Sequence, residues 1–201
     1  MNAPELIPLG KRAATRARIC EAANALFFER GFAAVTMEQV ALAADIQRST
    51  LYLHFREKDD ILAAIAEDYT AKLRPVIARL PGPVPTRAEI AAWVDEFAAF
   101  VSEERAATEL LVTLSHLPKA PSAAIAFGKA LQAMMADRLP AFGRALEPGQ
   151  TIAYAWAVAT MDHLGWALCH HARTGGDPIA EARLQVAVAQ LDHFCARRIL
   201  R

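Results

Sequence analysis

Residues 36–58 read TMEQVALAADIQRSTLYLHFREK, and this stretch decides the fold of the N-terminal third of the chain. Thr36 offers a hydroxyl at the start of a helix. Gln39, three residues later, completes a Thr-x-x-Gln capping box, in which each side chain bonds the backbone N–H of the other residue. Because Val40 and its neighbours supply one apolar face, the pattern predicts a short helix over about 37–44.

A second short helix is predicted over about 47–55, after a tight break at Asp45. Aspartate is one of the few residues besides glycine that tolerate a left-handed turn position. Leu51 and Phe55 lie four residues apart and are expected to face inward together. Two helices joined by so few residues are typical of a helix-turn-helix, which we place at about 36–55.

The outward face of the second short helix carries side chains suited to a DNA major groove about 12 Å wide. Arg48 and Tyr52 share this face. The planar guanidinium of Arg48 can bond guanine O6 and N7 together, so Arg48 is the expected base reader. Phosphate oxygens are within the expected reach of Thr50, Tyr52, His54 and Lys58.

A longer helix is expected before this motif, from about Lys11 to Arg30. Gly31 directly after it is expected to take the left-handed conformation that ends many helices, with Phe32 folding back onto the helix. The first twenty residues hold four basic residues against one acid. This local positive charge suits DNA, and it also suits a solvated helix start.

The segment 36–58 resembles the tetracycline-repressor (TetR) family of bacterial transcription regulators. The matching positions follow a helix closed by Arg30-Gly31-Phe32, and they are Thr36, Ala41, Ala44, Ile46, Thr50, Leu51, Tyr52, His54, Phe55 and Lys58. The resemblance implies that Arg48, Ser49 and Thr50 face bases, whereas Tyr52, His54 and Lys58 contact the DNA backbone. The full set of expected DNA-binding residues is Thr36, Glu38, Gln47, Arg48, Ser49, Thr50, Tyr52, His54 and Lys58.

Two roles fit Glu38: it accepts a hydrogen bond from cytosine N4, or it is a solvated acid at a helix start. Many family members have glycine where Asp45 stands, and serine where Gln47 and Glu57 stand. These helix starts are therefore expected to be less well capped. The alternatives to DNA binding are a structural helical hairpin and an adaptor that contacts protein through this unit.

Beyond the motif, helical periodicity continues to the end of the chain, with breaks at proline and glycine. The predicted helices lie at about 58–80, 86–104, 106–115, 122–139, 149–173 and 178–200. Pro75 is expected to break or kink the first of them, because proline lacks a backbone N–H and its ring clashes with the preceding turn. The run Pro81-Gly82-Pro83-Val84-Pro85 forbids helix and is interpreted as the main connection between the first part and the rest.

These elements predict an all-α fold, since no segment shows the alternation of a half-buried strand. We expect a flexible N-terminal arm over 1–10 and a three-helix helix-turn-helix DNA-binding domain over 11–72. A larger helical ligand-binding and dimerisation domain is expected over 73–201. A chain of 201 residues is long enough for this arrangement.

The last two predicted helices are apolar on more than one face. One stripe on the helix at 149–173 consists of Ile152, Trp156, Ala159, His163, Trp166 and His170. Such helices need cover on two sides, as in a symmetric four-helix dimer interface, which the resemblance also implies. Gly165 is expected to allow close approach across the axis, but the sequence does not decide which face meets the partner.

A cluster of aromatic and methionine side chains in the second part is a candidate ligand pocket. The expected ligand-binding residues are Trp93, Phe97, Phe100, His116, Met134, Trp156 and His163. Such side chains suit a small hydrophobic or aromatic effector. An ordinary core uses the same residue types.

Several potential metal ligands occur near the end of the chain, namely Asp162, His163, Cys169, His170 and His171. His163 and His170 are seven residues apart, about 10 Å along a helix, which is too far for both to hold one ion. Known catalytic motifs are missing from the sequence, so we expect neither an enzyme nor a metal or other cofactor. The alternatives are a metal-responsive regulator and a helical metal-dependent enzyme that uses His and Asp of the C-terminal domain.

Composition limits the partners and the compartment. The chain has 22 basic and 22 acidic residues, which excludes a strongly basic surface as the reason for DNA binding. Its three cysteines fit free thiols in a reducing cytoplasm. The longest stretch without Asp, Glu, Lys, Arg or His has fourteen residues, whereas about 20 are needed to cross a bilayer. With no legible signal peptide, we expect a cytoplasmic protein without membrane contact.

Together these patterns predict a sequence-specific transcriptional regulator that binds double-stranded DNA. The expected form is a homodimeric repressor on a palindromic operator, released by a small hydrophobic or aromatic effector.

Overall fold

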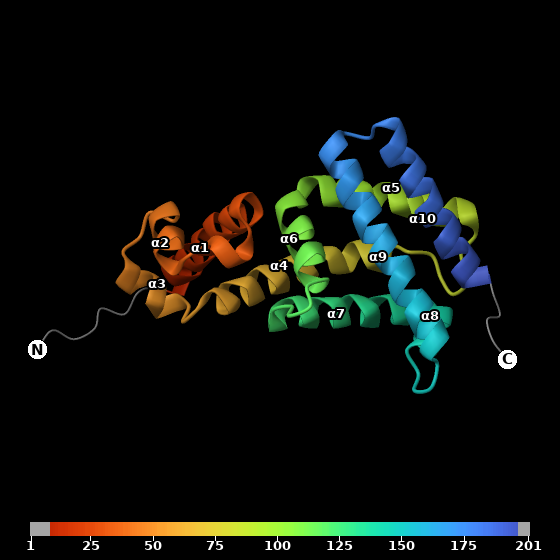
Figure 1. The fold of residues 1–201 in the computed structure, drawn as a ribbon, viewed down its shortest axis with the longest axis horizontal. Helices are drawn as coiled ribbons and strands as arrows, with labels where there is room; N and C mark the ends of the chain where they lie inside the picture. The colour runs from red at the N-terminus through yellow and green to blue at the C-terminus, as the bar shows by residue number, and fades with distance from the viewer. Residues whose placement is uncertain (1–8, 197–201) are drawn as a thin grey trace, which may run out of the picture.

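The computed structural model describes residues 9–196, and within this range every regular element is a helix (Figure 1). The elements are α1 (Leu9–Arg30), η1 (Phe32–Ala34), α2 (Met37–Ala43), α3 (Arg48–His54), α4 (Lys58–Ala78), α5 (Arg87–Glu103), α6 (Arg105–Ser115), α7 (Ser122–Arg138), α8 (Pro140–Ala145), α9 (Thr151–Thr174) and α10 (Pro178–Ala196). The predicted all-α fold is confirmed. The first eight residues of the expected N-terminal arm, and the end of the last predicted helix, lie outside the described residues.

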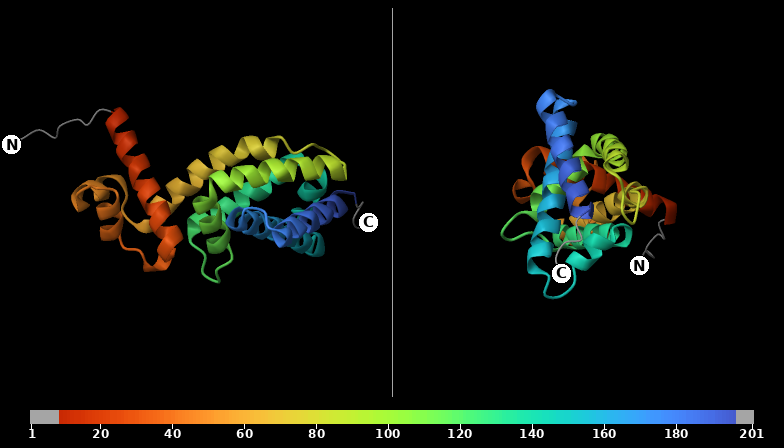
Figure 2. Two further views of the ribbon diagram at one scale, coloured as in Figure 1. Left: turned by 90° about the horizontal axis from the view of Figure 1, so that it is seen from above. Right: turned by 90° about the vertical axis from the view of Figure 1, so that its right-hand side faces the viewer.

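The helices α1, α2 and α3 form a helix-turn-helix domain at one end of an elongated molecule (Figures 1 and 2). Helix α4 leads from this domain into the larger helical domain, where it packs along α7 and also contacts α5 and α6. Helix α1 contacts both α4 and α6. The N-terminal domain is therefore attached to the larger one through α1 and α4.

Two expectations about proline are corrected. Helix α4 runs unbroken through Pro75 to Ala78, because neighbouring helices hold it on several sides. The segment around Pro81–Pro85 joins α4 to α5 within the larger domain, at the end remote from the helix-turn-helix (Figure 2). The connection between the two domains is thus a continuous helix, and the proline-rich loop is a connection between neighbouring helices of one domain.

The face that α9 turns toward the core differs from the stripe singled out in the sequence. Ala157, Thr160, Leu164 and Ala167 are buried at helical spacing. The predicted stripe lies on a more exposed side, where the Ile152 side chain is 74% exposed. In a helix so rich in alanine, apolar residues occur on every side, so periodicity alone does not identify the inner face.

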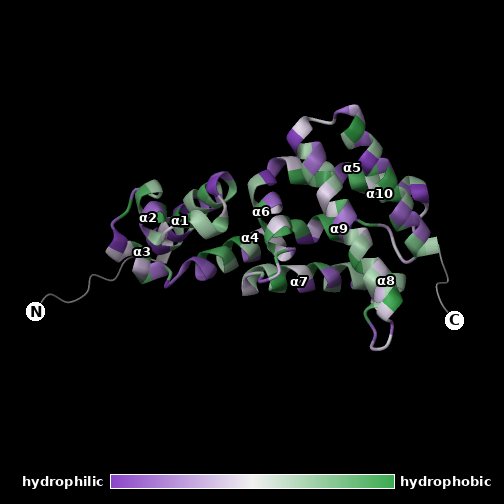
Figure 3. Cartoon of the chain, viewed as in Figure 1, coloured by the Kyte–Doolittle hydropathy of each residue, from purple (hydrophilic) through white to green (hydrophobic). Residues whose placement is uncertain are grey.

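Hydrophilic and hydrophobic residues occur on both domains, with local differences between helices (Figure 3). Hydrophilic residues are frequent on α3 and the start of α4, whereas hydrophobic residues predominate on α8 and the adjoining turns of α9. None of the helices in the range 9–196 is long and apolar enough to cross a membrane.

Candidate DNA-binding surface and ligand cavity

The start of α2 is fixed by the predicted capping box. The Thr36 backbone N–H donates to Gln39 Oε1 over 2.9 Å, and the Gln39 N–H donates to Thr36 Oγ1 over 3.3 Å. The turn after α2 places Asp45 at a φ of 50°, as expected for a left-handed position. The Ile46 N–H then donates to the Ala41 carbonyl over 3.0 Å, which closes the turn. Local interactions therefore set the angle at which α3 leaves α2.

Buried apolar side chains hold α3 against the rest of the domain. Leu51 is fully buried and Phe55 nearly so. The Arg16 guanidinium from α1 lies 4.2 Å from the centre of the Phe55 ring, and its Nη1 donates to the His54 carbonyl over 3.5 Å. This inner face of α3 leaves its outer face open to solvent.

The outer face of α3 presents Arg48, Ser49 and Tyr52, all of them exposed. Arg48 Nη2 lies 2.8 Å from Glu38 Oε1, and the guanidinium lies 5.5 Å from the centre of the Tyr52 ring. Thr36 and Gln47 are also exposed, whereas Thr50 is half-buried. The surface therefore brings the expected base-facing residues together beside α2.

Glu38 is ionised at neutral pH in this arrangement. Its pKa is lowered by the hydrogen bond from its own backbone N–H, then by the Thr36 hydroxyl, and to a smaller degree by the Arg48 charge. Such a carboxylate at the start of α2 interacts favourably with the helix dipole. Because both side chains remain largely in solvent, the ion pair with Arg48 stabilises the fold little, but it restricts where the guanidinium points.

His54, at the end of α3, is half-buried beside the basic residues of α1. Partial burial lowers its pKa, and the positive charges of Arg12 and Arg16 lower it further. The imidazole is therefore mostly neutral at pH 7. A neutral ring can still donate one hydrogen bond to a phosphate oxygen.

Lys58 begins α4, but its ammonium is engaged inside the protein. Nζ donates to the Phe32 carbonyl over 2.8 Å and to the Ala33 carbonyl over 3.2 Å, and it lies 4.9 Å from the centre of the Phe32 ring. These contacts connect α4 to η1, a turn that the sequence did not reveal. The expected phosphate contact would therefore have to compete with acceptors within the chain.

Gly31 departs from the expectation for a helix end. Its φ of 81° is positive as predicted, but its ψ of 141° lies outside the left-handed helical region. Phe32 does fold back, and its ring packs edge-on against Phe27 with 4.9 Å between centres. The chain thus turns sharply at a position that only glycine adopts readily.

Leu53 is an exposed residue of α3 that the sequence reasoning missed. Its side chain is 67% exposed beside Tyr52. An apolar side chain on this face fits contact with a thymine methyl group. The sequence spacing indicates this exposure, because Leu53 lies four residues after the outward-facing Ser49 and so on the same face of the helix.

A cavity of about 90 Å³ lies inside the larger domain, between α4, α5, α6, α7 and α9. Its wall is mostly apolar, with Leu73, Phe97, Val101, Phe127, Met161 and Leu164 among the contributors. Gly128 and Gly165 also line it. A Cβ on Gly165 would meet Val112 of α6 at 3.6 Å, so Gly165 packs toward α6 within the chain, which corrects the expectation that it lies against a second copy.

The structure separates the seven expected ligand-binding residues. Only Phe97 and His116 line this cavity. Trp93 is buried and donates from Nε1 to the Val76 carbonyl over 2.8 Å, Phe100 packs against Phe97 and Tyr69, and Met134 is buried in the core. The other two belong to the α9 and α10 pair: Trp156 packs against Phe194, and His163 Nδ1 lies 2.6 Å from Gln190 Oε1.

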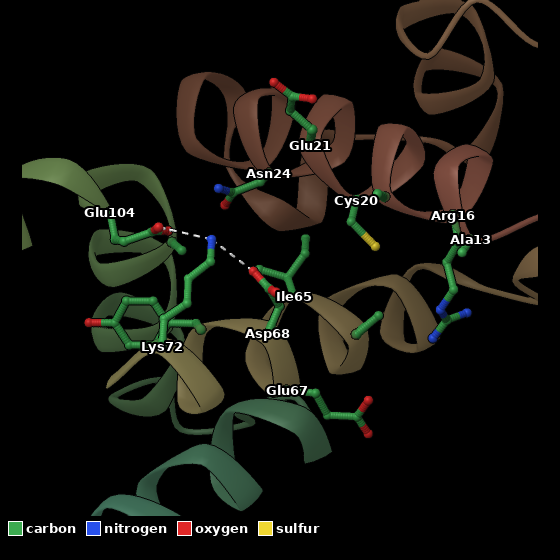
Figure 4. Close-up of a pocket in the computed structure, with 14 residues that line it drawn as sticks. Ala13, Arg16, Cys20, Glu21, Asn24, Ile65, Glu67, Asp68, Lys72 and Glu104 are labelled. Carbon is green, nitrogen blue, oxygen red and sulfur yellow. Dashed lines mark hydrogen bonds and ion pairs between the residues drawn. The ribbon is translucent and has the colours of Figure 1, made fainter. Parts of the chain in front are cut away.

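A second hollow, an open cleft of about 630 Å³, lies where α1 meets α4 and α6 (Figure 4). Lys72 stands in it, with Nζ 2.9 Å from Asp68 Oδ2 and 2.8 Å from Glu104 Oε1. Tyr69 lines both this cleft and the cavity. One side chain of α4 therefore separates the interior of the larger domain from the contact with α1.

The candidate metal ligands do not form a cluster in the described part of the chain. Asp162 lies against His116, with 3.2 Å between Oδ1 and Nε2, while His171 lies against Glu181. The cysteines are free thiols. Burial is the main cause that raises the pKa of Cys169 to about 12 and that of Cys195 to about 11, so both are protonated at neutral pH.

Comparison with known proteins identifies the helix-turn-helix domain. A sequence profile of "Bacterial regulatory proteins, tetR family" matches residues 19–65, from within α1 into α4. The fold of the chain is similar to that of SmeT in a SmeT–triclosan complex, with a TM-score of 0.61 and 21% identity over 88% of this chain and 90% of the other. Residues 19–65 are thus similar to the tetR family of bacterial regulatory proteins, and the likeness to SmeT extends to the fold of 88% of the chain.

Two known regulators of transcription are similar to this chain over limited stretches. The transcriptional regulator TtgR of Pseudomonas putida is 38% identical over 53 residues, which are 26% of this chain and 25% of TtgR. The transcriptional repressor KstR2 of Rhodococcus jostii is 33% identical over 82 residues, 39% of this chain and 40% of KstR2. The similarity thus spans less than half of either relative, both of which are named for regulating transcription.

Proposed function

We propose that this protein is a cytoplasmic transcriptional repressor that binds a palindromic operator as a homodimer and leaves it when a small hydrophobic or aromatic molecule occupies the cavity. In this proposal residues 11–72 bind DNA, and residues 73–201 bind the effector and the second copy. The observation that carries the proposal is the outer face of α3, where Arg48, Ser49 and Tyr52 stand exposed on a helix anchored by Leu51.

The chemistry of this face supports sequence-specific binding to double-stranded DNA. The Arg48 guanidinium provides the forked donor that suits guanine, and Leu53 on the same helix provides apolar contact for thymine. Donors such as Ser49, Tyr52 and His54 suit phosphate oxygens. Lys58 contributes mainly by holding α4 to η1, because its ammonium already has two acceptors.

The outer faces of α9 and α10 support a homodimer. Ile152 and Tyr154 on α9 and Val186 on α10 are exposed apolar side chains, with exposed fractions of 74%, 45% and 50%. Such a face loses unfavourable contact with water when another apolar surface covers it. A twofold pairing of the two helices with the same pair of a second copy would bury it, as in a four-helix bundle.

The route from cavity to DNA supports release by an effector. Tyr69 lines the cavity, and its hydroxyl lies 2.9 Å from Thr108 Oγ1 on α6. Helix α1 contacts both α4 and α6, in addition to α2 and η1 of its own domain. A molecule that enlarges the cavity therefore pushes on the helices that hold the DNA-binding domain. Tenfold release requires the effector to prefer the DNA-incompetent form by about 1.4 kcal/mol.

Electrophoretic mobility shift with DNA flanking the coding region tests the proposal. We expect a fragment that shifts at moderate salt and resists an excess of unrelated duplex. Arg48→Ala should bind the specific and the unrelated duplex with similar affinity, while Arg144→Ala, on α8 in the larger domain, serves as a charge-matched control. If every flanking fragment is displaced by unrelated DNA as easily as by itself, the proposal is wrong.

A further inference from the structure

The charged side chains of the cavity wall limit the kind of molecule that can bind there. No lysine or arginine occurs among the described residues that line the cavity, and Asp162 is the one carboxylate among them. Phe97, Phe127 and Tyr69 supply aromatic surface to the wall. An occupant therefore meets a mostly apolar wall and, at one end, the partly exposed carboxylate of Asp162.

Polar groups gather at one end of the cavity, near the end of α6. His116 Nε2 lies 3.2 Å from Asp162 Oδ1, and His116 Nδ1 lies 2.7 Å from the Val112 carbonyl. Both nitrogens of the imidazole are thus already directed at acceptors of the protein. Gln132 lines the same cavity, and its side-chain amide has no hydrogen-bond partner within residues 9–196.

An anionic ligand is disfavoured at this end. A carboxylate or phosphate in the cavity would lose its hydration next to the negative charge of Asp162. The nearest cationic candidate, His116, already faces that carboxylate. A hydroxyl or ammonium group, in contrast, can donate to Asp162 or to the Gln132 carbonyl oxygen, both of which line the cavity.

The volume of the cavity further limits which ligands can bind. A cavity of about 150 Å³ lined by Leu, Ile and Phe holds benzene, and this one measures about 90 Å³. One ring therefore fits only after a small movement of the wall. Met161 and Gln132 are unbranched and adaptable, and Gly128 has no atom within 4 Å of a Cβ built on it.

We propose that the cavity takes a small aromatic molecule whose polar end is a neutral or cationic hydrogen-bond donor, received by Asp162 or Gln132, and that it rejects anions of the same size. This proposal rests on the effector role of the cavity and specifies the chemical class of the effector. It assigns Asp162 as the residue that determines charge preference and Gln132 as a second acceptor.

Calorimetric titration with four compounds of one ring tests the proposal on the full chain without DNA. The probes are p-cresol, benzylamine, toluene and benzoate, which share a ring with a one-carbon substituent. We expect p-cresol and benzylamine to bind at least tenfold more tightly than benzoate, a difference of about 1.4 kcal/mol. Equal affinity for benzoate and p-cresol, or no binding of any probe, overturns the proposal.

Two variants assign the preference to residues. Asp162→Asn should weaken benzylamine and strengthen benzoate, with Asp192→Asn on α10 as a matched control that leaves the order unchanged. Gln132→Leu should weaken the binding of p-cresol more than that of toluene, and it should not strengthen the binding of benzoate. An unchanged order of the four probes in Asp162→Asn contradicts the assignment. Since these titrations contain no DNA, their outcome is independent of whether the chain binds an operator.

Discussion

The helix pairs α2–α3 and α9–α10 differ in what surrounds their exposed apolar side chains. Leu42 and Leu53 of the first pair lie near the charged and hydroxyl side chains around Arg48, whereas the exposed surface of the second pair includes Ile152 and Val186. Both pairs bury an apolar inner face, so their inner packing does not distinguish them. The difference teaches that the outer face of a helix pair indicates the chemistry of its partner, which we propose to be DNA for the first pair and a second copy for the other.

The two pairs also differ in how their geometry is fixed. A capping box and a left-handed residue set the angle between α2 and α3 through contacts a few residues apart. The α9–α10 pair is joined through Gly175 and Gly176, both at positive φ, and is held by packing over the length of both helices. Single substitutions are therefore expected to act on different properties in the two regions.

The largest effect is expected from the inner face of α3. Leu51→Ala should lower the free energy of unfolding by about 2–5 kcal/mol, because it leaves a cavity under a fully buried side chain. Leu53→Ala, two residues along and 67% exposed, should change it by less than about 0.5 kcal/mol. Urea unfolding measures both. Similar losses in the two variants would mean that α3 does not bury Leu51 in preference to Leu53.

Lys58 should behave as a structural residue. Lys58→Met keeps the apolar stem but removes the donor to the Phe32 and Ala33 carbonyls, and hydrogen bonds from charged groups are worth about 1.5–3 kcal/mol. We expect a loss of stability toward this range, with an unchanged salt dependence of DNA binding. If instead the slope of log DNA affinity against log salt concentration falls by about one while stability is unaffected, Lys58 contacts a phosphate.

Arg48 should act on sequence preference and not on stability. Arg48→Ala is expected to cost about 1–3 kcal/mol of discrimination at one base pair of each half-site. Unfolding should change little, since the ion pair with Glu38 is largely exposed. Fluorescence anisotropy with duplexes substituted at single positions measures the discrimination. A uniform loss of affinity for every duplex would assign Arg48 to the phosphates.

Replacing a glycine by alanine should have opposite effects on stability in the two domains. Gly31→Ala should destabilise the chain by about 1–3 kcal/mol, because its positive φ is nearly restricted to glycine. Gly165→Ala should stabilise it by about 0.5–1 kcal/mol through helix propensity, since a Cβ there meets Val112 at an ordinary 3.6 Å. Thermal unfolding compares them. If Gly165→Ala is as harmful as Gly31→Ala, α9 and α6 leave no room for a methyl group between them.

The sequence predicts the helix-turn-helix well because its determinants are local. The Thr36 and Gln39 pair, the turn at Asp45 and the inward Leu51 act within a few residues of one another, and the structure confirms each. The elements η1 and α8 escaped prediction. Both are one or two turns long, and too short for periodicity to be visible.

The larger domain is predictable from the sequence in outline but not in detail. Helix bounds agree within a few residues, yet only Phe97 and His116 of the expected ligand set line the cavity. Which side of an alanine-rich helix faces inward depends on neighbours distant in the sequence. The same holds for the Lys58 ammonium, whose acceptors lie about 25 residues earlier in the chain.

Operator spacing tests most directly whether the α2–α3 pair reads DNA while the α9–α10 pair joins two copies. The measurement compares the affinity for an identified palindromic operator with that for the same duplex carrying about five extra base pairs, half a helical turn, at its centre. Recognition helices of a dimer meet half-sites about 34–36 Å apart, so half a helical turn places the second half-site on the wrong side of the duplex. We predict that the affinity falls to that of a duplex with one half-site. Equal affinity for the two spacings would contradict a rigid dimer that reads two half-sites.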